Sequence, residues 1–407
     1  MTAQAWLVLT VFATVYLGMI LGGLPRLQLD RTGVALLGAI VLVGAGVMSP
    51  QQAAATVHLP TILLLFAFMV ISAQMRLGGF YAALTRRITA LPLRAPALLA
   101  LVIVVVAALS AVFSNDIVCL AVAPVLVHAC LARRLDPIPF LLALACAANI
   151  GSAATLIGNP QNMLIGEVLR LSFGAYLVEA IVPVGLGLVV LWALLVRDLA
   201  AAPAGAAAGG AADDPPFDRW QAGKGLAVAG VLVALFLFSE VPRDVAALTG
   251  AGVLLLSARF HSSRVMGLID WELLVLFVGL FVVNAALAQT GLVAQALDAL
   301  AGQGVVLGDP WPLFAGTLLL SNLVSNVPAV MLLLPAAEGH GAGTTLALVS
   351  TLAGNLLIVG SIANIIVVDA ARRQGVIIDW KRHARTGVPV TLATLALTAG
   401  WLAWRMV

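Results

Sequence analysis

Two short polar segments interrupt a chain that is otherwise almost wholly apolar. The first is Ser114-Asn115-Asp116, and the second runs from Ala148-Asn149-Ile150 to Gly158-Asn159-Pro160-Gln161-Asn162. In hydrocarbon, polar side chains and interrupted backbone survive only where protein or a water-filled cavity surrounds them. The two segments therefore predict an ion and substrate site at membrane depth. The alternative is a polar loop that merely joins two spans.

Pro160 predicts a break in the helix that carries the second segment. Proline has no N–H, and its ring would clash with the carbonyl of Leu156 and free that oxygen. Freed carbonyls and amide oxygens can coordinate a small cation. The helix that restarts after the break points its N-terminal amides at an anion. One broken helix can thus serve both the coupling ion and the substrate.

Asp116 is the one acidic residue that we expect deep in the membrane. A carboxylate at that depth is expensive, and it usually pairs with a cation or takes up a proton. The alternative is an Asp that caps a helix at a hydrated hairpin tip. Asp369 and Glu272 are expected near the cytoplasmic ends of spans.

The composition is that of a membrane protein, because the 407 residues are 62% hydrophobic and only 10% charged. Apolar stretches typical of spanning helices recur along the chain: Ala5–Leu24, Gly33–Met48, Thr61–Met75, Tyr176–Val196, Leu226–Phe238, Val245–Ala258, Trp271–Ala288 and Val388–Trp404. We expect the lipid bilayer and a small-molecule anion as partners, and no nucleic acid. No cofactor is expected, and the three cysteines form no metal-binding pattern.

The basic residues orient the chain. If Met1 lies outside and each span reverses the direction, only Arg170, Arg243 and Arg405 remain outside, and the other 18 of the 21 lysines and arginines lie inside. Cytoplasmic loops carry such an excess. We therefore expect a multi-pass protein of the inner (cytoplasmic) membrane with both termini external.

The two halves of the sequence resemble one another at offsets of roughly 200 to 215 residues, which indicates an internal repeat. Ser114-Asn115 matches Ser325-Asn326, and Gly158–Asn162 matches Gly360-Ser361-Ile362-Ala363-Asn364. Five spans per unit, an odd number, would make the second unit inverted, which is a secondary-transporter architecture. The expected fold is therefore an all-α polytopic membrane protein.

The expected units, each with a re-entrant helical hairpin and a broken helix, have these bounds: a first repeat at 1–197 with hairpin 96–131 and broken helix 138–170; a cytoplasmic linker at 198–219; and a second repeat at 220–407 with hairpin 311–335 and broken helix 344–371. The second hairpin is the clearer one, because its short second arm cannot cross about 30 Å of hydrocarbon. For residues 96–131, two complete spans are the alternative. The second break has no proline, so its sequence signal is weaker.

The candidate site combines both tips and both breaks. For the substrate we assign Ser114, Asn115, Asn159, Asn162, Ser325, Asn326, Ser361 and Asn364. For the coupling ion we assign Asp116, Asn115, Asn149, Gly158, Asn326, Asn355 and Gly360, with Na⁺ at the hairpin tips or H⁺ on the carboxylate. No lysine or arginine belongs to this set, so helix ends, hydroxyls, amides and nearby cations would hold an anion.

At these motifs, and at Ser321-Asn322-Leu323-Val324-Ser325-Asn326-Val327-Pro328, the chain resembles the ion transporter superfamily over nearly its full length. This group includes divalent-anion/sodium symporters, citrate carriers, arsenite efflux permeases and related anion permeases. The resemblance implies hairpins entering from opposite faces, elevator-like movement of a transport domain, sodium sites between each tip and its facing break, and often a homodimer. The symporters typically carry Ser-Asn-Thr at both tips, whereas Asp116 and Val327 look more like the arsenite permeases.

The leading hypothesis is a cation-coupled secondary transporter of a small anion, either an inorganic oxyanion or a di- or tricarboxylate. The alternatives are proton-coupled efflux of arsenite or antimonite, and a sodium/proton antiporter based on Asp116. An intramembrane hydrolase would need a nucleophile and a base or paired aspartates at helix depth, which the sequence does not offer. We therefore expect a transporter rather than an enzyme.

Overall fold

The computed structural model describes residues 2–24, 27–199, 216–337, 339 and 341–406. Outside these ranges lie Met1, Arg26, Val407 and residues 200–215 of the expected linker. The predictions about the location of these residues therefore concern residues that the structure does not describe.

The first half of the described chain forms ten α-helices, with a two-residue strand pair after the first of them. Its elements are α1 (Ala3–Leu21), β1 (Gly23–Leu24), β2 (Leu29–Asp30), α2 (Arg31–Gly44), α3 (Pro50–Thr56), α4 (Leu59–Leu77), α5 (Phe80–Ala90), α6 (Ala95–Val112), α7 (Asn115–Ala132), α8 (Pro137–Ser152), α9 (Pro160–Val168), α10 (Phe173–Leu195) and the 3₁₀ turn η1 (Val196–Asp198).

The second half also forms ten α-helices. Its elements are α11 (Arg219–Phe238), α12 (Arg243–Leu255), α13 (Ser262–Met266), α14 (Trp271–Gln289), α15 (Leu292–Gly302), α16 (Pro310–Val324), α17 (Asn326–Leu333), η2 (Leu334–Ala336), α18 (Ala342–Ala353), η3 (Ile358–Gly360), α19 (Ile362–Arg373) and α20 (Trp380–Met406). The expected helical class is confirmed, with the short antiparallel β1–β2 pair as the exception.

Eight of the described helices are long and apolar enough to cross a membrane: α1, α4, α6, α7, α10 with η1, α11, α14 and α20. The expected spans at Gly33–Met48 and Val245–Ala258 are helices α2 and α12, which have 14 and 13 residues. The structure therefore has the helical content of a polytopic membrane protein.

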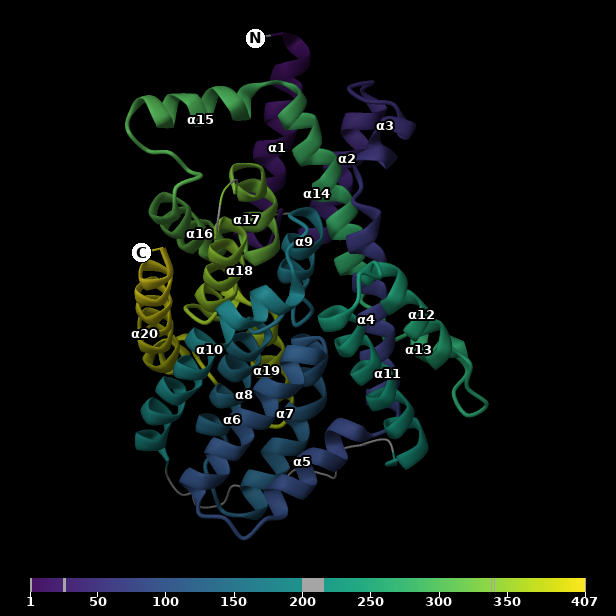
Figure 1. Cartoon of the computed structure of the whole chain (residues 1–407), viewed down its shortest axis with the longest axis vertical. Coiled ribbons are helices and arrows are strands. Elements are labelled where there is room, and N and C mark those ends of the chain that lie inside the picture. The colour runs from purple at the N-terminus through teal and green to yellow at the C-terminus, as the bar shows by residue number, and fades with distance from the viewer. Residues whose placement is uncertain (1, 25–26, 200–215, 338, 340, 407) are drawn as a thin grey trace.

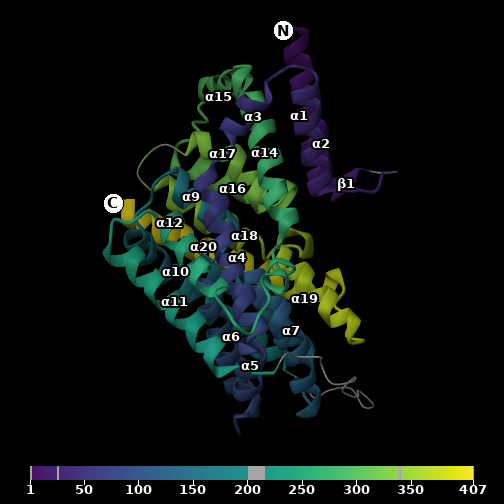
Figure 2. The ribbon, with the colours of Figure 1, turned by 90° about the vertical axis from the view of Figure 1, so that its right-hand side faces the viewer.

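The helices form two groups. The first, which we call the framework, consists of α1, α2, α4, α11, α12 and α14, in which α2 packs against α14 and α12 packs against α4. The second, the central bundle, consists of α6 to α10 and α16 to α20, in which α8 packs against α6 and α7, and α18 packs against α16. The framework runs along the right-hand side of Figure 1, with α6 and α7 in the lower half of the bundle and α16 and α17 in the upper half. Figure 2 shows α1 and α2 at the upper end of the molecule and α11 lower on the other side.

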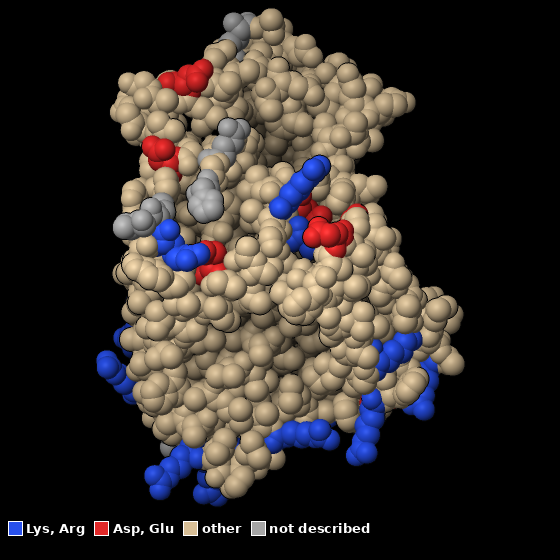
Figure 3. Space-filling model, viewed as in Figure 1, with Lys and Arg blue, Asp and Glu red and all other residues tan. Residues whose placement is uncertain are grey.

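Charge is distributed unevenly along the long axis. In Figure 3, lysine and arginine side chains gather at the lower end, and the visible acidic side chains lie higher. The turn that joins α7 to α8, with Arg133 and Arg134, belongs to the lower end of the ribbon. In Figure 3, a mostly uncharged surface separates the basic lower end from the acidic and basic side chains near mid-height. An uncharged surface is expected where a protein faces lipid.

A glycine allows the closest helix approach in the bundle. At Gly151, an added Cβ would lie 2.3 Å from the backbone Cα of Ala107. The atom in the way is backbone rather than a flexible side chain, so α6 and α8 can approach this closely only without a side chain there. Small residues that let backbones come together are typical of helix packing in membranes.

We expect Gly151→Ala to lower the thermal unfolding temperature of the detergent-solubilised protein, because overpacking costs roughly 1–3 kcal/mol. The matched control is Gly185→Ala in α10, where an added Cβ meets no atom within 4 Å. This control should leave the temperature unchanged or raise it slightly. Equal effects of the two substitutions would contradict the close packing of α6 on α8.

Candidate functional site

The first polar segment forms the turn between α6 and α7. The backbone N–H of Ser114 donates to Ser72 Oγ of α4 at 3.3 Å. The backbone N–H of Asn115, the first residue of α7, donates to the carbonyl oxygen of Gly158 at 3.4 Å. The tip of this helix pair thus touches both the framework and the interruption between α8 and α9.

The second tip is strained. Ser325, between α16 and α17, has φ 75° and ψ 162°, a backbone conformation that is essentially reserved for glycine. Such strain costs on the order of 1–3 kcal/mol and persists where the surroundings impose it, often at functional sites. If the side-chain amide of Asn326 is turned so that its nitrogen faces the neighbouring acceptors, it donates to the carbonyls of Ser350 and Gly360 at 3.0 and 3.3 Å.

The first interruption covers residues 153–159, between α8 and α9. Asn159 caps α9, because its Oδ1 accepts the backbone N–H of Asn162 at 2.9 Å, and Pro160 is the first helical residue. Its missing N–H is one that a helix start leaves unpaired in any case. The helix therefore breaks where Pro160 predicts it: Leu156 lies outside the helix, and Pro160 is the first residue of α9.

The second interruption forms without a proline, between Ala353 at the end of α18 and Ile362 at the start of α19. The side-chain amide of Asn364 donates to the carbonyls of Gly354 and Leu357 at 2.9 and 3.1 Å. In the first interruption, Asn162 likewise donates to the carbonyl of Thr155 at 3.0 Å. An asparagine that satisfies freed carbonyls, rather than a proline, is what the two interruptions share.

Asn149 of α8 joins the two halves. Its Nδ2 donates to Asn355 Oδ1 at 2.9 Å and to Asn364 Oδ1 at 3.2 Å, and its Oδ1 accepts from the Ser361 hydroxyl at 2.9 Å and from Asn115 Nδ2 at 3.4 Å. All five side chains are buried. One amide thus connects the first tip to the second interruption.

Thr351 of α18, in the second half, makes the corresponding contacts with the first interruption. Its hydroxyl donates to Asn162 Oδ1 at 3.2 Å and accepts from Asn159 Nδ2 at 3.3 Å and from Gln161 Nε2 at 3.2 Å. The residues of the two sets follow one another at the same spacing: Asn149, Ser152, Asn159 and Asn162, and Thr351, Gly354, Ser361 and Asn364. Each interruption is therefore tied to the helix that precedes the other one.

A cavity of about 30 Å³ lies where the tips and interruptions meet. Its polar wall is formed by Asn115, Asp116, Gln161, Ser325, Asn326 and Ser361, and none of the lining residues is basic. One water needs about 10–15 Å³ of such volume, so this cavity has room for an ion or a few waters. We call it the tip cavity.

The structure brings together five of the candidate residues at the tip cavity: Asn115, Asp116, Ser325, Asn326 and Ser361. Asn149, Asn159, Asn162, Asn355 and Asn364 lie behind its wall, fully or almost fully buried, with amides bonded to one another or to the backbone. The Gly158 carbonyl accepts the tip N–H of Asn115, and the Gly360 carbonyl faces Asn326.

Several oxygens at the tips are buried and have no hydrogen-bond partner among the described residues. Asn115 Oδ1 and Ser110 Oγ lie at the first tip, and Asn322 Oδ1 and Ser321 Oγ lie at the second. Buried polar atoms are normally paired, so such exceptions point to an ion or water that fits between them. Sequence reasoning gave no role to Ser110, which stands outside the quoted motifs, nor to Ser321, Asn322 and Gln161, which stand within them. Their signal was a polar residue within one or two turns of each motif.

A larger cavity of about 280 Å³ adjoins the tip cavity, and Asp116 and Leu273 line both. We call it the vestibule. Its charged and polar lining is Arg76 of α4, Ser114, Asp116 and Asp270, the residue that caps α14. No hydrogen bond or ion pair reaches the carboxylate of Asp116 within the part of the chain that the structure describes. Arg76 was not among the candidate residues, although an arginine at the end of an apolar helix was a visible signal.

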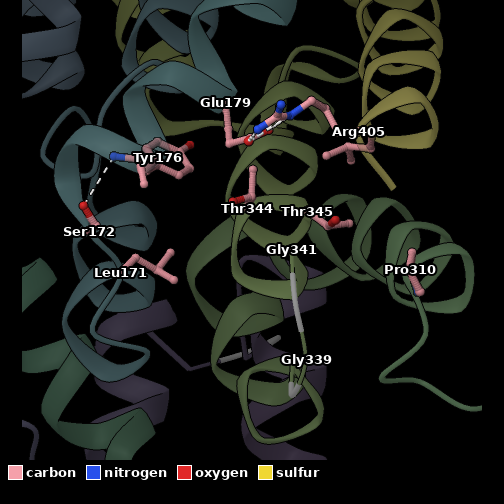
Figure 4. Close-up of a pocket in the computed structure, with 12 residues that line it drawn as sticks. Leu171, Ser172, Tyr176, Glu179, Pro310, Gly339, Gly341, Thr344, Thr345 and Arg405 are labelled. Carbon is pink, nitrogen blue, oxygen red and sulfur yellow. Dashed lines mark hydrogen bonds and ion pairs between the residues drawn. The ribbon is translucent and has the colours of Figure 1, made fainter. Parts of the chain in front are cut away.

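A third cavity, of about 320 Å³, lies between α10, α18 and α20 (Figure 4). Glu179 and Arg405 form an ion pair on its wall, with Arg405 Nε 3.0 Å from Glu179 Oε1. None of the candidate residues lines it. Tyr176 connects it to the site, because its hydroxyl donates to the Ala153 carbonyl at 2.7 Å and accepts from Asn162 at 3.2 Å. This cavity is larger than the tip cavity, but none of the buried unpaired side-chain atoms of the described residues belongs to its lining.

The chain belongs to the citrate transporter family, whose model matches residues 7–353. This result confirms the resemblance to the ion transporter superfamily, and it identifies the protein as a membrane transporter of this anion-transporter family rather than an enzyme.

Its similarity to individual proteins extends over nearly the whole chain. It is 30% identical to an uncharacterized transporter of Mycobacterium tuberculosis, over 92% of this chain and 94% of that one. It is also 30% identical to the silicon efflux transporter LSI3 of Oryza sativa subsp. japonica, over 95% of each chain. Among solved structures, the Alcanivorax borkumensis YdaH transporter has the same fold, with a TM-score of 0.59, 15% identity and coverage of 98% and 97%.

We expect Asn149→Ala to lower the thermal unfolding temperature markedly in sodium-free detergent solution. The substitution leaves buried groups on Asn355, Asn364 and Ser361 without their partner, and each such loss costs roughly 1–3 kcal/mol. The matched control is Asn322→Ala, since the Asn322 amide donates only to the Leu318 carbonyl within its own helix. Asn149→Ala protein as stable as the control would mean that the network does not hold the two halves together.

Proposed function

We propose that this protein is a cation-coupled secondary transporter of a small oxyanion or carboxylate that works by elevator-type alternating access. The observation that carries the proposal is the position of Asp116. Its carboxylate lies in the wall between the tip cavity and the vestibule and has no partner among the described residues. A carboxylate in such a position needs a cation or a proton. Binding at that point can therefore be coupled to the passage of substrate.

The architecture that we propose is the inverted repeat, with units at 1–197 and 220–407. The order of helices supports it, since each half contains ten α-helices, so that α1 to α10 can be paired one by one with α11 to α20. The reciprocal bonds of Asn149 and Thr351 support it further, because they relate the two interruptions to each other. Both tips line one cavity, although α6 and α7 lie in the lower half of the bundle and α16 and α17 in the upper half (Figure 1).

We propose that both helix pairs at the tips are re-entrant hairpins. α17 has eight residues, about 12 Å of helix, which is too short to cross about 30 Å of hydrocarbon. α6 and α7 have 18 residues each, about 27 Å of helix. They are long enough for complete spans, but their shared tip lies against the buried α8–α9 interruption rather than at an end of the molecule.

The coupling ion is H⁺ or Na⁺, and the site offers groups for each. Asp116 can carry a proton. The unpaired oxygens of Asn115 and Asn322 are hard oxygen donors of the kind that Na⁺ prefers, and one stands at each tip. We place the basic lower end of Figure 3 in the cytoplasm of the inner membrane, as the excess of arginine and lysine favours.

A second candidate substrate is a neutral weak acid such as arsenite or antimonite, expelled in exchange for protons. The lining of the tip cavity favours it, because a carboxylate without a basic residue repels an anion but accepts hydrogen bonds from the hydroxyls of a neutral acid. Names of relatives point the same way: one is a silicon efflux transporter, and a putative transporter arsB of Dictyostelium discoideum matches 43% of this chain at 29% identity.

We expect Asp116→Asn to abolish gradient-driven transport in proteoliposomes while the protein still folds. Asparagine keeps the size and the hydrogen-bonding capacity, and the Asp116 carboxylate caps no backbone N–H of α7, so the substitution removes no helix cap. Loss of charge at the coupling site would instead remove the driving force. With proton coupling, the pH dependence of transport should disappear in the variant; with sodium coupling, the sodium dependence should disappear.

The control for this experiment is Asp298→Asn, which removes an exposed carboxylate from α15, away from both cavities. It should transport at the wild-type rate. Wild-type rate and ion dependence in Asp116→Asn as well would mean that the Asp116 carboxylate holds neither the coupling cation nor a coupling proton.

Variants of Arg76 can distinguish an anionic substrate from a neutral weak acid. For an anion, a guanidinium on the vestibule wall concentrates the substrate at the entrance, so Arg76→Gln should raise KM by about tenfold or more at low salt. Arg76→Lys, which keeps the charge, should largely restore it. For a neutral acid, KM should be unchanged in both variants. Uptake or efflux of oxyanions, dicarboxylates and arsenite, measured with each variant at two salt concentrations, gives the answer.

A further inference from the structure

An ion pair joins the central bundle to the framework at the far end of α9. Arg243, the first residue of α12, places its Nε 2.9 Å from Glu167 Oε1, and the two side chains are only 15% and 11% exposed. Arg243 also donates to the carbonyl of Gly166 at 2.7 Å. Because α12 belongs to the framework and α9 to the bundle, any movement of one group past the other must break this pair.

Arg31 is the counterpart of Arg243 in the other half. Each is the first residue of its helix, α2 or α12. The two helices bury residues at matching positions, Val34, Ala35, Ala39 and Leu42 in α2 and Ala246, Ala247, Ala251 and Leu254 in α12. They also pack on matching partners, α14 and α4. The two arginines therefore stand at equivalent corners of the framework.

Asp369 is the counterpart of Glu167. Asn162 and Asn364 bond their interruptions in the same way, and Glu167 follows Asn162 at the same spacing as Asp369 follows Asn364. Arg170 and Arg372 also match one another in this alignment. The half-buried pair Arg243–Glu167 thus has a potential repeat equivalent, Arg31–Asp369.

This second pair is not formed. Asp369 instead pairs with Arg373 of its own helix at 2.7 Å, where both side chains are mostly exposed, 54% and 78%. Arg31 Nε is buried and has no hydrogen-bond partner among the described residues. A buried donor without a partner costs free energy, so Arg31 is in a position that lacks a partner in this conformation.

The surroundings of α9 and α19 also differ: α9 is packed against the framework, and α19 borders a cavity. α9 packs against α4, whereas α19 makes its main contacts with α7 and α8 of the bundle. Leu164 on α9 is fully buried, and its counterpart Ile366 on α19 lines the vestibule. Figure 2 shows the start of α2, next to β1, and α19 on the same side of the molecule. The structure is thus closed at the Arg243–Glu167 end and hollow beside α19.

We propose that Arg31 and Asp369 form, in the oppositely facing state, the ion pair that Arg243 and Glu167 form here. One pair is made as the other is broken, and each holds the bundle against the framework at one end. The inference rests on the alternating access proposed above. Transport needs two states of similar free energy, and exchange of one ion pair for an equivalent one keeps that difference small.

Cross-linking tests the geometry without any substrate. In full-length protein in membranes, with Cys119, Cys130 and Cys146 replaced by alanine, a short bifunctional thiol reagent should link Arg243→Cys/Glu167→Cys. It should also link Arg31→Cys/Asp369→Cys, which are joined only in the other state. The mismatched pair Arg31→Cys/Glu167→Cys should not be linked. If Arg243→Cys/Glu167→Cys is linked and Arg31→Cys/Asp369→Cys is not, the proposal is wrong.

Thiol labelling of Ile366→Cys in the vestibule then measures the balance of the two states. Arg243→Gln should lower its labelling rate several-fold, because the state seen here loses its ion pair. Arg31→Gln should raise the rate or leave it unchanged. Arg373→Gln should change it little, because its ion pair with Asp369 is exposed and lies within one helix. A fall in labelling with Arg31→Gln, or no fall with Arg243→Gln, would overturn the proposal. Labelling needs no substrate, so an unexpected labelling result contradicts only the proposed exchange of ion pairs. The proposed function would instead be contradicted by wild-type protein that transports nothing.

Discussion

The structure depends on one constraint: polar groups in the middle of a membrane protein must find partners within the protein. Two helices stop halfway, at the α8–α9 and α18–α19 interruptions, and each leaves carbonyls that have lost their helical N–H partners. Water cannot satisfy them in hydrocarbon. Asn162 and Asn364 do so instead, and Asn149 and Thr351 in turn hold these two asparagines. The two halves therefore cannot be completed separately, since each supplies the partner that the other needs.

The same constraint gives meaning to the groups that remain unpaired. Most buried side chains around the interruptions are hydrogen-bonded, whereas oxygens of Asn115 and Asn322 at the two tips are not. The carboxylate of Asp116 also lacks a partner, and it separates a cavity of about 30 Å³ from one of about 280 Å³. These unpaired oxygens and the unpaired carboxylate support the proposal that an ion binds at the tips. The strain at Ser325 lies at that same point.

The division into framework and bundle follows from the helix contacts. Within the framework, α2 and α14 and likewise α4 and α12 meet through small and branched apolar residues, and Gly279 lets α14 approach the backbone of α2 at Ala35. Within the bundle, α6 and α8 meet at Gly151 in the same way. Between the two groups, by contrast, the contacts include a few separable polar ones, such as Ser72 with the Ser114 N–H and Arg243 with Glu167. Few polar contacts need to be exchanged when such groups move, so two arrangements can have similar free energies.

The sequence by itself determined the class of the protein and the segments in which its buried polar side chains gather. Long apolar runs have only one stable form in lipid, the helix, so the helical membrane class followed from composition. A carboxylate and amides amid those runs had to be functional or paired, and this singled out Ser114–Asp116 and Gly158–Asn162. The repeated motif pointed to Asn364 although no proline accompanies it.

Only the tertiary structure decided which of those polar residues line a cavity and which hold the fold. Asn115, Asp116 and Ser361 face the tip cavity, whereas Asn149, Asn162 and Asn364 are engaged with one another behind it. The residue types are the same on both sides of this division, so no pattern along the chain could separate them. Arg76 and Asp270 likewise come from distant parts of the sequence, and only the packing of the helices makes them line the same cavity as Asp116. Hydrogen bonds between residues some 200 positions apart bury some amides and leave others at the cavity, and this difference arises only when the two halves pack together.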